Sequence, residues 1–550
     1  MKALLLYPEF SLFGFWNYRD VCRLLGAKYP ASPLGMITMA ALLPSEWELH
    51  LMDLNTMTLK DSDIDWADLV FIGGMLPQQN RFLSLIDRVH SRGKKVVAGG
   101  PGPTRVFSRA KKVAAGGPET TSQPHIFDKA DYLVLGEAEC SIPLFLEDLE
   151  KGVQSGVYIA NRKPEMTKSP VPRFDLLNFK NYLMIGIQFC RGCPFKCEFC
   201  DIVELYGRKP RTKTPQQIVN ELDALYNLGY RGHVDFVDDN LIGHKEKAKD
   251  MLLAVKDWSE KHNYPFFYST EASINLADDD ELLGLMRDLD FRYVFVGIES
   301  ADENVLNNVH KKQNVNRKLI DDIDKIHRHG LVVNGSFIVG FDNETSDSAS
   351  MIVDIIEKGN LCMSMISLLF ALPDTQLTRR LENENRLLGD FAEYSERNIS
   401  DIDQVTTGIN FITKRPRLEI INDYIYILTE AYSTTNYFNR CLNLGKVLKT
   451  NFRYKPSWKR KVRYAVGFLK IVFKLGLRPS TAFYFWRNVF VILFTRISSI
   501  ESVVNLMAMY LHFHRQSRFI TDLMKENLKD LEITTARPSK AEAFAASSRS

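Results

Sequence analysis

The sequence lacks the features of several common classes of protein. Its 70 Lys and Arg against 67 Asp and Glu leave a net charge of +3 over 550 residues, a surplus too small to predict nucleic-acid binding. Arg487 splits the most apolar stretch, so no uninterrupted run of about 20 apolar residues is available to cross a bilayer. The start, MKALLLYPEF, lacks the basic region and long apolar core of a signal peptide. We therefore expect a cytoplasmic globular protein with no nucleic-acid partner.

Cysteine is scarce except in one short stretch. The chain has eight cysteines, and those outside this stretch are scattered singly at Cys22, Cys140, Cys362 and Cys441. Such scatter is not a secreted disulfide framework, and it fits a reducing compartment. The remaining four lie in QFCRGCPFKCEFCD, residues 188–201. There Cys193, Cys197 and Cys200 form C-x3-C-x2-C, with Cys190 three positions upstream.

This spacing predicts an iron–sulfur cluster with one open iron. Three thiolates can hold three irons of a cubane and leave the fourth without a protein ligand. Gly192 lets the backbone bend close to the cluster, Pro194 stiffens the loop and Phe199 shields it from water. The alternatives are a zinc site or a purely structural role. The cysteine pairs stand too close for paired zinc knuckles, and a bacterial ferredoxin run would read C-x2-C-x2-C-x3-C.

Residues 1–155 predict a doubly wound α/β domain. Apolar runs of strand length, such as KALLLYP, ELHLMDL, DLVFIGG, KKVVAGG and YLVLGEAE, alternate with helical patterns. Several of these strands end in glycine or a polar turn, as a close approach of backbone to a ligand requires. The alternative is an α/β domain of this kind that binds nothing.

A short tandem duplication interrupts this domain. SRGKKVVAGGP from Ser91 recurs as SRAKKVAAGGP from Ser108, with nine of eleven positions identical at an offset of 17 residues. Two copies are too few for a solenoid. One copy supplies the central strand and its ligand loop, and we expect the other to bulge out as an exposed loop. The sequence leaves open which copy is which.

The rest of the chain predicts a barrel and a helical domain. A proline-bearing linker at 156–182 precedes six strand-like segments, each followed by a helix-like one, over 183–400. Six βα units predict an incomplete parallel (β/α)6 barrel, in which chemistry sits at the carboxyl ends of the strands. A helical domain is expected at 401–530 and a disordered tail at 531–550.

A long segment of the helical domain carries positive charge only. Between Ala431 and Ile500 there is no Asp or Glu, whereas Lys and Arg number fourteen and alternate with aromatic and aliphatic residues. Basic and apolar faces together predict peripheral contact with an anionic membrane, on its inner surface. The alternatives are a solvated basic cap on the barrel and a dock for an acidic electron donor such as flavodoxin.

These motifs together carry a family resemblance. C-x3-C-x2-C with an aromatic residue before its last cysteine, at the head of a six-unit barrel, resembles the radical S-adenosylmethionine (SAM) superfamily. PLGMITMAALLP from Pro33, WADLVFIGGML from Trp66, the AGGP turns and VLGE from Val134 resemble its cobalamin-binding subclass. FCRGCPFKCEFCDI, FVDDN, TEASINLADD and GIES are most similar to the branch of the hopanoid C-2 methylases. The resemblance covers residues 1 to about 520.

The resemblance implies three cofactors and their sites. Cys193, Cys197 and Cys200 would ligate a [4Fe-4S] cluster whose open iron binds SAM, with Cys190 a bystander. SAM contacts are implied at Phe199, Asp238, Asp239, Asn240, Glu271, Ser273, Glu299, Ser300 and Gly340. Cobalamin contacts are implied at Gly35, Gly74, Met75, Gln78, Gly99, Gly100, Gly116, Gly117, Gly136 and Glu137. Asp238 and Asp239 have the alternative of being turn residues, and Glu299 of being a helix-cap partner.

One motif of many cobalamin proteins is missing. They supply a histidine to cobalt from D-x-H-x-x-G, which this sequence lacks; in DRVHSRG, from Asp87, the spacing is one residue too long. We interpret His90 as a solvent-facing helix residue, and expect cobalamin without a histidine below the cobalt.

The activity implied by the resemblance is methylation of an unactivated carbon, through a 5'-deoxyadenosyl radical and methylcobalamin. The substrate class is a lipid or another natural product, and a flavodoxin or ferredoxin would supply electrons. A radical rearrangement or ring-forming enzyme that uses cobalamin, and a cobalamin or iron–sulfur sensor without turnover, are the alternatives.

Overall fold

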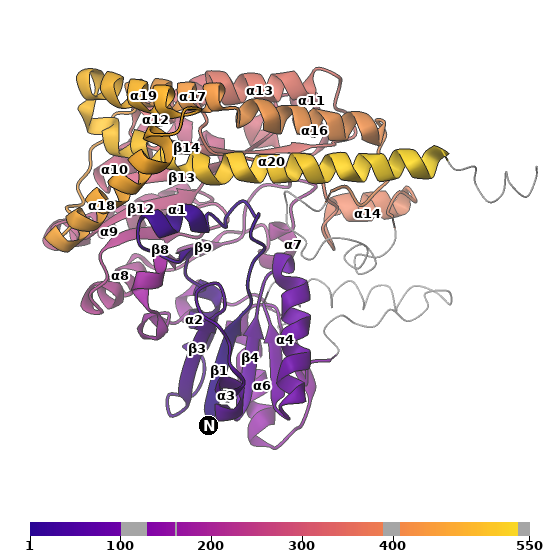
Figure 1. Cartoon of the computed structure of the whole chain (residues 1–550). Coiled ribbons are helices and arrows are strands. Elements are labelled where there is room, and N and C mark those ends of the chain that lie inside the picture. Colours follow the sequence, from indigo (N-terminus) through magenta and orange to yellow (C-terminus); the bar gives the residue numbers. More distant parts are fainter. Residues whose placement is uncertain (101–128, 160–161, 389–407, 537–550) are drawn as a thin grey trace, which may run out of the picture.

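The computed structural model describes residues 1–100, 129–159, 162–388 and 408–536. Figure 1 shows an N-terminal α/β domain, a curved parallel sheet above it, and a layer of helices that ends in the long helix α20. This is the predicted order of α/β domain, barrel and helical domain.

The N-terminal domain is built on a parallel sheet in the order β3-β1-β4-β5-β6-β7. Its strands are β1 (Lys2–Tyr7), β3 (Glu48–Asp53), β4 (Leu69–Gly73), β5 (Lys95–Gly99), β6 (Tyr132–Leu135) and β7 (Gly156–Ile159). Helices α3 (Asp61–Trp66) and α4 (Gln79–Ser91) share a buried cluster with one face, and α2 (Leu34–Ala40) and α6 (Ala138–Glu150) with the other. The predicted doubly wound fold is therefore confirmed, and the strand order reverses between β1 and β4, where ligands bind in this fold.

Two features of this sheet are not evident from the sequence. β5 comes from the first copy of the duplication, which answers the question of which copy occupies the sheet. The second copy and its predicted bulge lie outside the described residues. β7 pairs with β6, although it begins at residue 156, where we predicted the linker. Its four residues are too short to give a periodic signal.

The second sheet has the order β15-β14-β13-β12-β11-β8-β2 and is parallel throughout. Six strands are those predicted: β8 (Tyr182–Ile187), β11 (Gly232–Phe236), β12 (Phe266–Glu271), β13 (Phe291–Glu299), β14 (Val332–Val339) and β15 (Ser364–Leu368). The crossover helices are α8 (Pro215–Asn227), α9 (Lys245–Lys261), α10 (Asp280–Asp288), α12 (Leu319–Arg328) and α13 (Ser348–Lys358). The seventh strand, β2 (Tyr29–Ala31), comes from the N-terminal region and joins the two domains.

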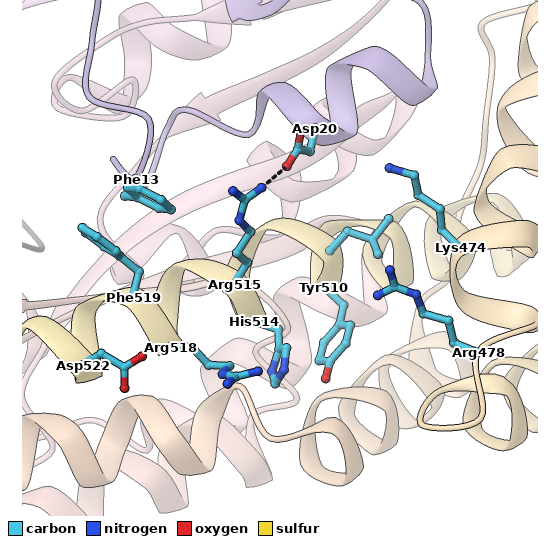
Figure 2. Close-up of a pocket in the computed structure, with 11 residues that line it drawn as sticks. Phe13, Asp20, Lys474, Arg478, Tyr510, His514, Arg515, Arg518, Phe519 and Asp522 are labelled. Atoms are coloured by element: carbon cyan, nitrogen blue, oxygen red, sulfur yellow. Dashed lines mark hydrogen bonds and ion pairs between the residues drawn. The ribbon is translucent and has the colours of Figure 1, made fainter.

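The helical layer consists of α16 (Arg417–Ala431), α17 (Thr434–Val447), α18 (Trp458–Ile471), α19 (Ala482–Thr495) and α20 (Ile500–Ala536). α20 packs against α1 (Arg19–Leu24) near the start of the chain, where Arg515 pairs with Asp20 at 3.1 Å and the rings of Phe13 and Phe519 stack (Figure 2). Residues 13–20 thus contact residues 515–519, which are about 500 positions later in the sequence. Within the described ranges, none of the helices has the length and apolar character needed to span a membrane.

Candidate functional site

The cysteine loop follows β8 at the carboxyl edge of the curved sheet, as predicted. It begins at the short strand β9 (Cys190–Arg191), which pairs with β10 (Arg211–Thr212), and ends at α7 (Ile202–Tyr206). All of its thiols are free. The Nδ2 of Asn240 lies 3.9 Å from the sulfur of Cys193, and the Nε2 of Gln313 lies 3.6 Å from that of Cys197. Amide donors of this kind tune the potential of cluster sulfurs.

The donor set fits an iron–sulfur cluster. Burial raises the pKa of Cys193, and it raises that of Cys200 to about 12; the charges of neighbouring thiols add to both shifts. Bound iron would offset the cost of charging these two thiols. No three acidic, Cys or His side chains of the described residues converge on one metal position. A cubane does not need such convergence, because each thiolate binds a different iron.

The backbone of the loop is held by Gly192 and two aspartates. Gly192 has φ +93°, and an added Cβ would lie 2.6 Å from the carbonyl oxygen of Gly207. Asp239 Oδ2 accepts a hydrogen bond from Gly192 N at 2.8 Å. Asp238 Oδ1 accepts from the backbone N–H groups of Phe189, at 2.9 Å, and Cys190. The aspartates at the end of β11 thus shape the cluster loop.

Burial disfavours the ionised form of the same two carboxyl groups. Burial raises the pKa of Asp238 to about 7 and that of Asp239 to about 6. At the end of β12, burial and then the charges of Asp235, Asp239 and Asp238 raise the pKa of Glu271 to about 8. The described contacts leave Asp238 Oδ2 buried without a hydrogen-bond partner. A polar ligand at this edge would satisfy it.

Other predicted SAM contacts gather nearby. Asn240 Nδ2 lies 3.1 Å from Ser273 Oγ, and Asn240 Oδ1 accepts from Ser273 N at 3.2 Å. The rings of Phe199 and Phe341 are 5.7 Å apart. These residues come from the cysteine loop and from the ends of β11, β12 and β14, and they lie at one edge of the sheet. Their contact with SAM stays a prediction.

Glu299 has protein partners of its own. It has φ +67°, its Oε1 accepts from Lys311 Nζ at 2.6 Å, and its Oε2 accepts from Ser336 Oγ at 3.1 Å. The Lys311 ammonium lies 5.9 Å from the Phe199 ring centroid. Neighbouring Ser300 is buried, and its Oγ accepts from the backbone N–H of Asp302.

Gly340 also bonds within the protein. It has φ +110°, and its N–H donates to Glu344 Oε2 at 2.8 Å. This left-handed conformation suits glycine, and it turns the chain directly after β14.

Glycines and exposed Met75 line the carboxyl edge of the N-terminal sheet. A Cβ at Gly100, φ +102°, would lie 2.8 Å from the carbonyl oxygen of Gly74, so β4 and β5 end close together. Met75 is 45% exposed, and buried Gln78 donates to Pro8 O at 2.5 Å and accepts from Met75 N at 2.8 Å.

The other implied cobalamin glycines contribute little bulk to this edge. Gly99 ends β5, Gly136 has φ +79° directly after β6, and Gly35 has open space where a Cβ would lie. A surface so poor in side chains fits a broad, flat ligand. Gly116 and Gly117 lie outside the described residues.

His90 lies at the opposite edge of that sheet. Its Nε2 is 2.9 Å from Asp131 Oδ2, which also accepts from Val96 N at the amino end of β5. The predicted solvent-facing position is therefore only partly right, since the ring is 35% exposed and hydrogen-bonded. A residue at the amino edge is far from a ligand at the carboxyl edge.

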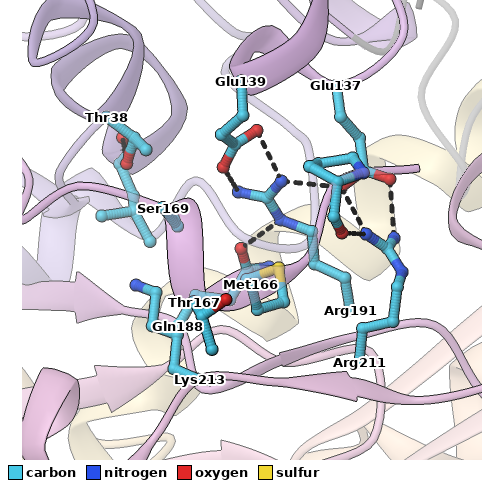
Figure 3. Close-up of polar contacts among 12 residues, drawn as sticks. Thr38, Glu137, Glu139, Met166, Thr167, Ser169, Gln188, Arg191, Arg211 and Lys213 are labelled. Atoms are coloured by element: carbon cyan, nitrogen blue, oxygen red, sulfur yellow. Dashed lines mark hydrogen bonds and ion pairs between the residues drawn. The ribbon is translucent and has the colours of Figure 1, made fainter. Parts of the chain in front are cut away.

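An ion-pair network joins the cysteine loop of the barrel to the carboxyl edge of the N-terminal sheet (Figure 3). Arg191, in the cluster loop, donates from Nη1 to Glu137 Oε2 at 2.8 Å, and its Nη2 lies 2.8 Å from Glu139 Oε1. Arg211 Nη2 donates to Glu137 Oε1 at 2.6 Å. Glu137, implied as a cobalamin contact, therefore has both carboxylate oxygens engaged with arginines of the barrel, and its contact with the corrin stays a prediction.

Comparison with known proteins gives the family. The radical SAM superfamily matches residues 187–356, and a domain of unknown function, DUF4070, matches 375–526. An uncharacterized methyltransferase of Synechocystis sp. is 40% identical over 96% of this chain and 94% of its own length. The hopanoid C-2 methylase of Rhodopseudomonas palustris is 31% identical over 83% of this chain and 82% of its own. The chain belongs to the radical SAM family of the hopanoid C-2 methylase.

Solved structures share the fold of this radical SAM enzyme. The cobalamin-dependent SAM radical enzyme OxsB, with aqua-cobalamin and SAM bound, has a TM-score of 0.56 at 13% identity, over 98% of this chain and 82% of its own. The radical SAM methyltransferase TsrM of Kitasatospora setae, with cobalamin and a [4Fe-4S] cluster bound, has a TM-score of 0.56 at 15% identity, over 85% of this chain and 98% of its own. At these identities the likeness shows a common fold.

Sequence reasoning missed several residues of this radical SAM site. Gln313 lies beside Cys197 and Lys311 beside the ring of Phe199, although more than a hundred residues separate them in the sequence. Arg191 and Arg211 pair with Glu137 across domains. Lys311 and Gln313 lie in no motif, so only the fold brings them in. Only Arg191 could have been singled out from the sequence, because it lies within the cysteine run.

Proposed function

We propose that this enzyme methylates an unactivated carbon of a lipid or other natural product, with a [4Fe-4S] cluster, SAM and cobalamin. The observation that carries the proposal is the joining of two ligand-binding edges: the cysteine loop of the barrel is held against the carboxyl edge of the doubly wound domain by Arg191 and Glu137. The names of the two relatives described above, both methyl-transferring enzymes, support methyl transfer as the reaction.

The side chains at this site would bind the cofactors, orient them and shield the reacting groups from water. Cys193, Cys197 and Cys200 would hold the cluster, which together with SAM supplies hydrogen abstraction, while cobalamin supplies the methyl group. Asn240 and Gln313 direct amide N–H groups at two of the sulfurs. Phe199 and Phe341 form an apolar wall beside the loop, which would exclude water from a radical.

The glutamates and arginines between the domains would set the distance between the two reacting cofactors. Arg191 is bonded at once to Glu137, Glu139 and Gln188. Because the cluster loop contains Arg191 itself, a shift of the N-terminal domain would move the loop. Fixed alignment of reacting groups is a main contribution that a protein makes to cofactor chemistry.

Reconstituted enzyme tests the proposal. With SAM, a strong reductant and cobalamin, we expect 5'-deoxyadenosine, S-adenosylhomocysteine and a methylated product. Cleavage of SAM without S-adenosylhomocysteine or methylated product would favour a rearrangement or ring-forming enzyme. No 5'-deoxyadenosine under strong reductant would favour a sensor. Mass spectrometry of a deletion strain, searching for species lighter by one methylene, would identify the substrate.

We also propose a flavodoxin or ferredoxin as the reducing partner, because the cluster must receive electrons to act. Peripheral contact with the inner surface of an anionic membrane is proposed for the helical domain, on the basis of its fourteen Lys and Arg without Asp or Glu between residues 431 and 500. Such contact would give a lipid substrate a route to the enzyme.

A further inference from the structure

The outer side of α18 carries a continuous apolar stripe. It extends through the π-helix that follows α18, Val472–Gly476, and its members are spaced by three or four residues. The stripe comprises Trp458, Val462, Val466, Leu469, Phe473 and Leu477, which are between 45% and 78% exposed. This spacing puts them on one helical face. An apolar stripe facing outward marks an interaction surface.

The opposite side of α18 explains why the stripe faces outward. Gly467, Ile471 and Leu475 are buried, and a Cβ at Gly467 would lie 3.2 Å from the carbonyl oxygen of Leu24 in α1. The helix is therefore held to the protein by one face. α19 and the short 3-10 helix that follows it, Ile497–Ser499, add a second outward row. It comprises Phe483, Phe490, Phe494 and Ile497, which are between 53% and 88% exposed. Figure 1 places α18 and α19 at the same end of the helical layer.

A row of cations runs beside the apolar stripe. Each follows a member of the stripe by one position, and all are exposed: Lys459, Arg463, Lys470, Lys474 and Arg478. Apolar and cationic rows side by side are typical of helices that lie in a membrane interface.

An open cavity of about 550 Å³ lies where this row meets α20 (Figure 2). Lys474 and Arg478 line it from one side, and Arg515 and Arg518 from α20. Arg515 pairs with Asp20, and Asp522 is the other carboxylate of the lining. Among the described residues, no carboxylate forms an ion pair with Lys474, Arg478 or Arg518, so the cavity has an excess of positive charge.

We propose that this cavity binds the phosphate of an anionic phospholipid, while the α18 stripe lies in the bilayer interface beside it. Charge decides between occupants. A second copy would bring another surface rich in cations and free of acidic residues between 431 and 500, and like charges repel. A nucleic acid would leave the apolar row in water. An anionic bilayer satisfies both rows, because it offers phosphates next to hydrocarbon.

This inference rests on the proposed membrane contact and is independent of the chemistry at the cluster. It is tested by flotation of the full-length protein with phosphatidylcholine vesicles, alone or mixed with phosphatidylglycerol or with oleate to the same surface charge. The cavity variant is Arg478→Ala/Arg518→Ala and the stripe variant is Phe473→Ser/Leu477→Ser. Lys247→Ala/Lys261→Ala, two exposed cations of α9, is the charge-matched control.

We expect binding to phosphatidylglycerol vesicles that weakens with salt. Each cation near an anionic surface contributes roughly fivefold to the affinity for the vesicle. The cavity variant loses two cations and should therefore bind about 30-fold more weakly. The stripe variant should also lose binding, and the control should match the wild type. Preference for phosphatidylglycerol over oleate is expected from a phosphate site.

Three results would overturn the inference: no flotation at low salt, equal binding to oleate vesicles, or a cavity variant that binds like the control. Calorimetric binding of glycerol 3-phosphate without flotation would assign the cavity to a soluble phosphate and reject the membrane. The yield of 5'-deoxyadenosine, measured without vesicles, should be the same in wild type, cavity variant and control. If the wild type makes 5'-deoxyadenosine and methylated product but does not float, the membrane docking is rejected and the proposed reaction is not.

Discussion

Arg191 Nη1 lies 2.8 Å from Glu137 Oε2, and this pair connects the cluster loop to the end of β6 in the N-terminal sheet. Both side chains are largely buried, at 11% and 6% exposure. Arg191 is adjacent to Gly192 in a loop whose backbone is also fixed by Asp238 and Asp239. Arg191 therefore links the cluster loop itself to the second proposed cofactor edge, and Arg211 bonds the same glutamate.

Arg191→Lys should destabilise the enzyme and loosen cobalamin. Lysine keeps the charge but cannot reproduce the fork that bonds Glu137, Glu139 and Gln188 together. Glu137 keeps Arg211, whereas buried Glu139 loses hydrogen bonds, so we expect a loss of about 1–3 kcal/mol in the free energy of unfolding. Urea unfolding and cobalamin retention on gel filtration measure the two effects. Arg173→Lys, at an exposed pair with Asp175, is the control and should cost less than about 1 kcal/mol. Equal losses in the two variants would contradict the role of Arg191.

Single cysteine replacements should separate the ligands from the bystander. Alanine at Cys193, Cys197 or Cys200 should abolish the cluster, as measured by iron and sulfide content and by electron paramagnetic resonance after reduction. Cys190→Ala should retain it, because the Cys190 thiol is buried and donates to Asn240 O at 3.3 Å. Loss of iron from Cys190→Ala with retention in another variant would reassign the ligands.

Gly192→Ala should disrupt the loop. The new Cβ would meet the Gly207 carbonyl at 2.6 Å and would disfavour φ +93°. We expect a lower iron content after reconstitution and a loss of about 1–3 kcal/mol in the free energy of unfolding. Gly284→Ala, in α10 with open space around it, should be neutral or stabilise by up to about 1 kcal/mol. A normal cluster in Gly192→Ala would show that the loop can rearrange.

Stability should fall as the pH rises from about 5 to about 8, partly because of Glu271. Burial and the neighbouring aspartates raise its pKa to about 8, so the folded state holds a proton that the unfolded state releases above its ordinary pKa of about 4.3. Over that window the unfolded state binds fewer protons, and its formation is favoured as pH rises. Thermal melts of Glu271→Gln should show a smaller decline. Glu246→Gln, an exposed residue of α9, should follow the wild type, and parallel declines in all three proteins would refute the assignment.

The two copies of the duplicated segment should respond differently to the same change. Val96 in β5 is fully buried, and Val113 is its counterpart 17 positions later. Val96→Asp would bury a carboxylate in the sheet and should prevent stable folding. Val113→Asp should melt like the wild type, because the first copy forms the strand β5. Comparable loss of soluble protein in both variants would contradict this.

Local patterns were enough to predict much of the fold. The alternation of apolar runs and helical periods gave the five strands of the first sheet up to β6 and the six strands from β8 to β15. β2 and β7 were missed because three or four residues carry no period, and β2 is held by pairing with β8 more than 150 positions later. The outward stripe of α18 was missed because a helical period does not say which face is covered.

By itself, the sequence determined the type of chemistry. Four cysteines in eleven positions are a local pattern, and their spacing predicts a cluster with an open iron. Only the tertiary structure decided how the loop is held: Asp238 and Asp239 bond its backbone, Gln313 faces a sulfur, and Arg191 reaches Glu137. The physical reason is that hydrogen bonds and ion pairs depend on distances of about 3 Å between side chains. Residues far apart in sequence reach such distances only after the two sheets have folded and packed together.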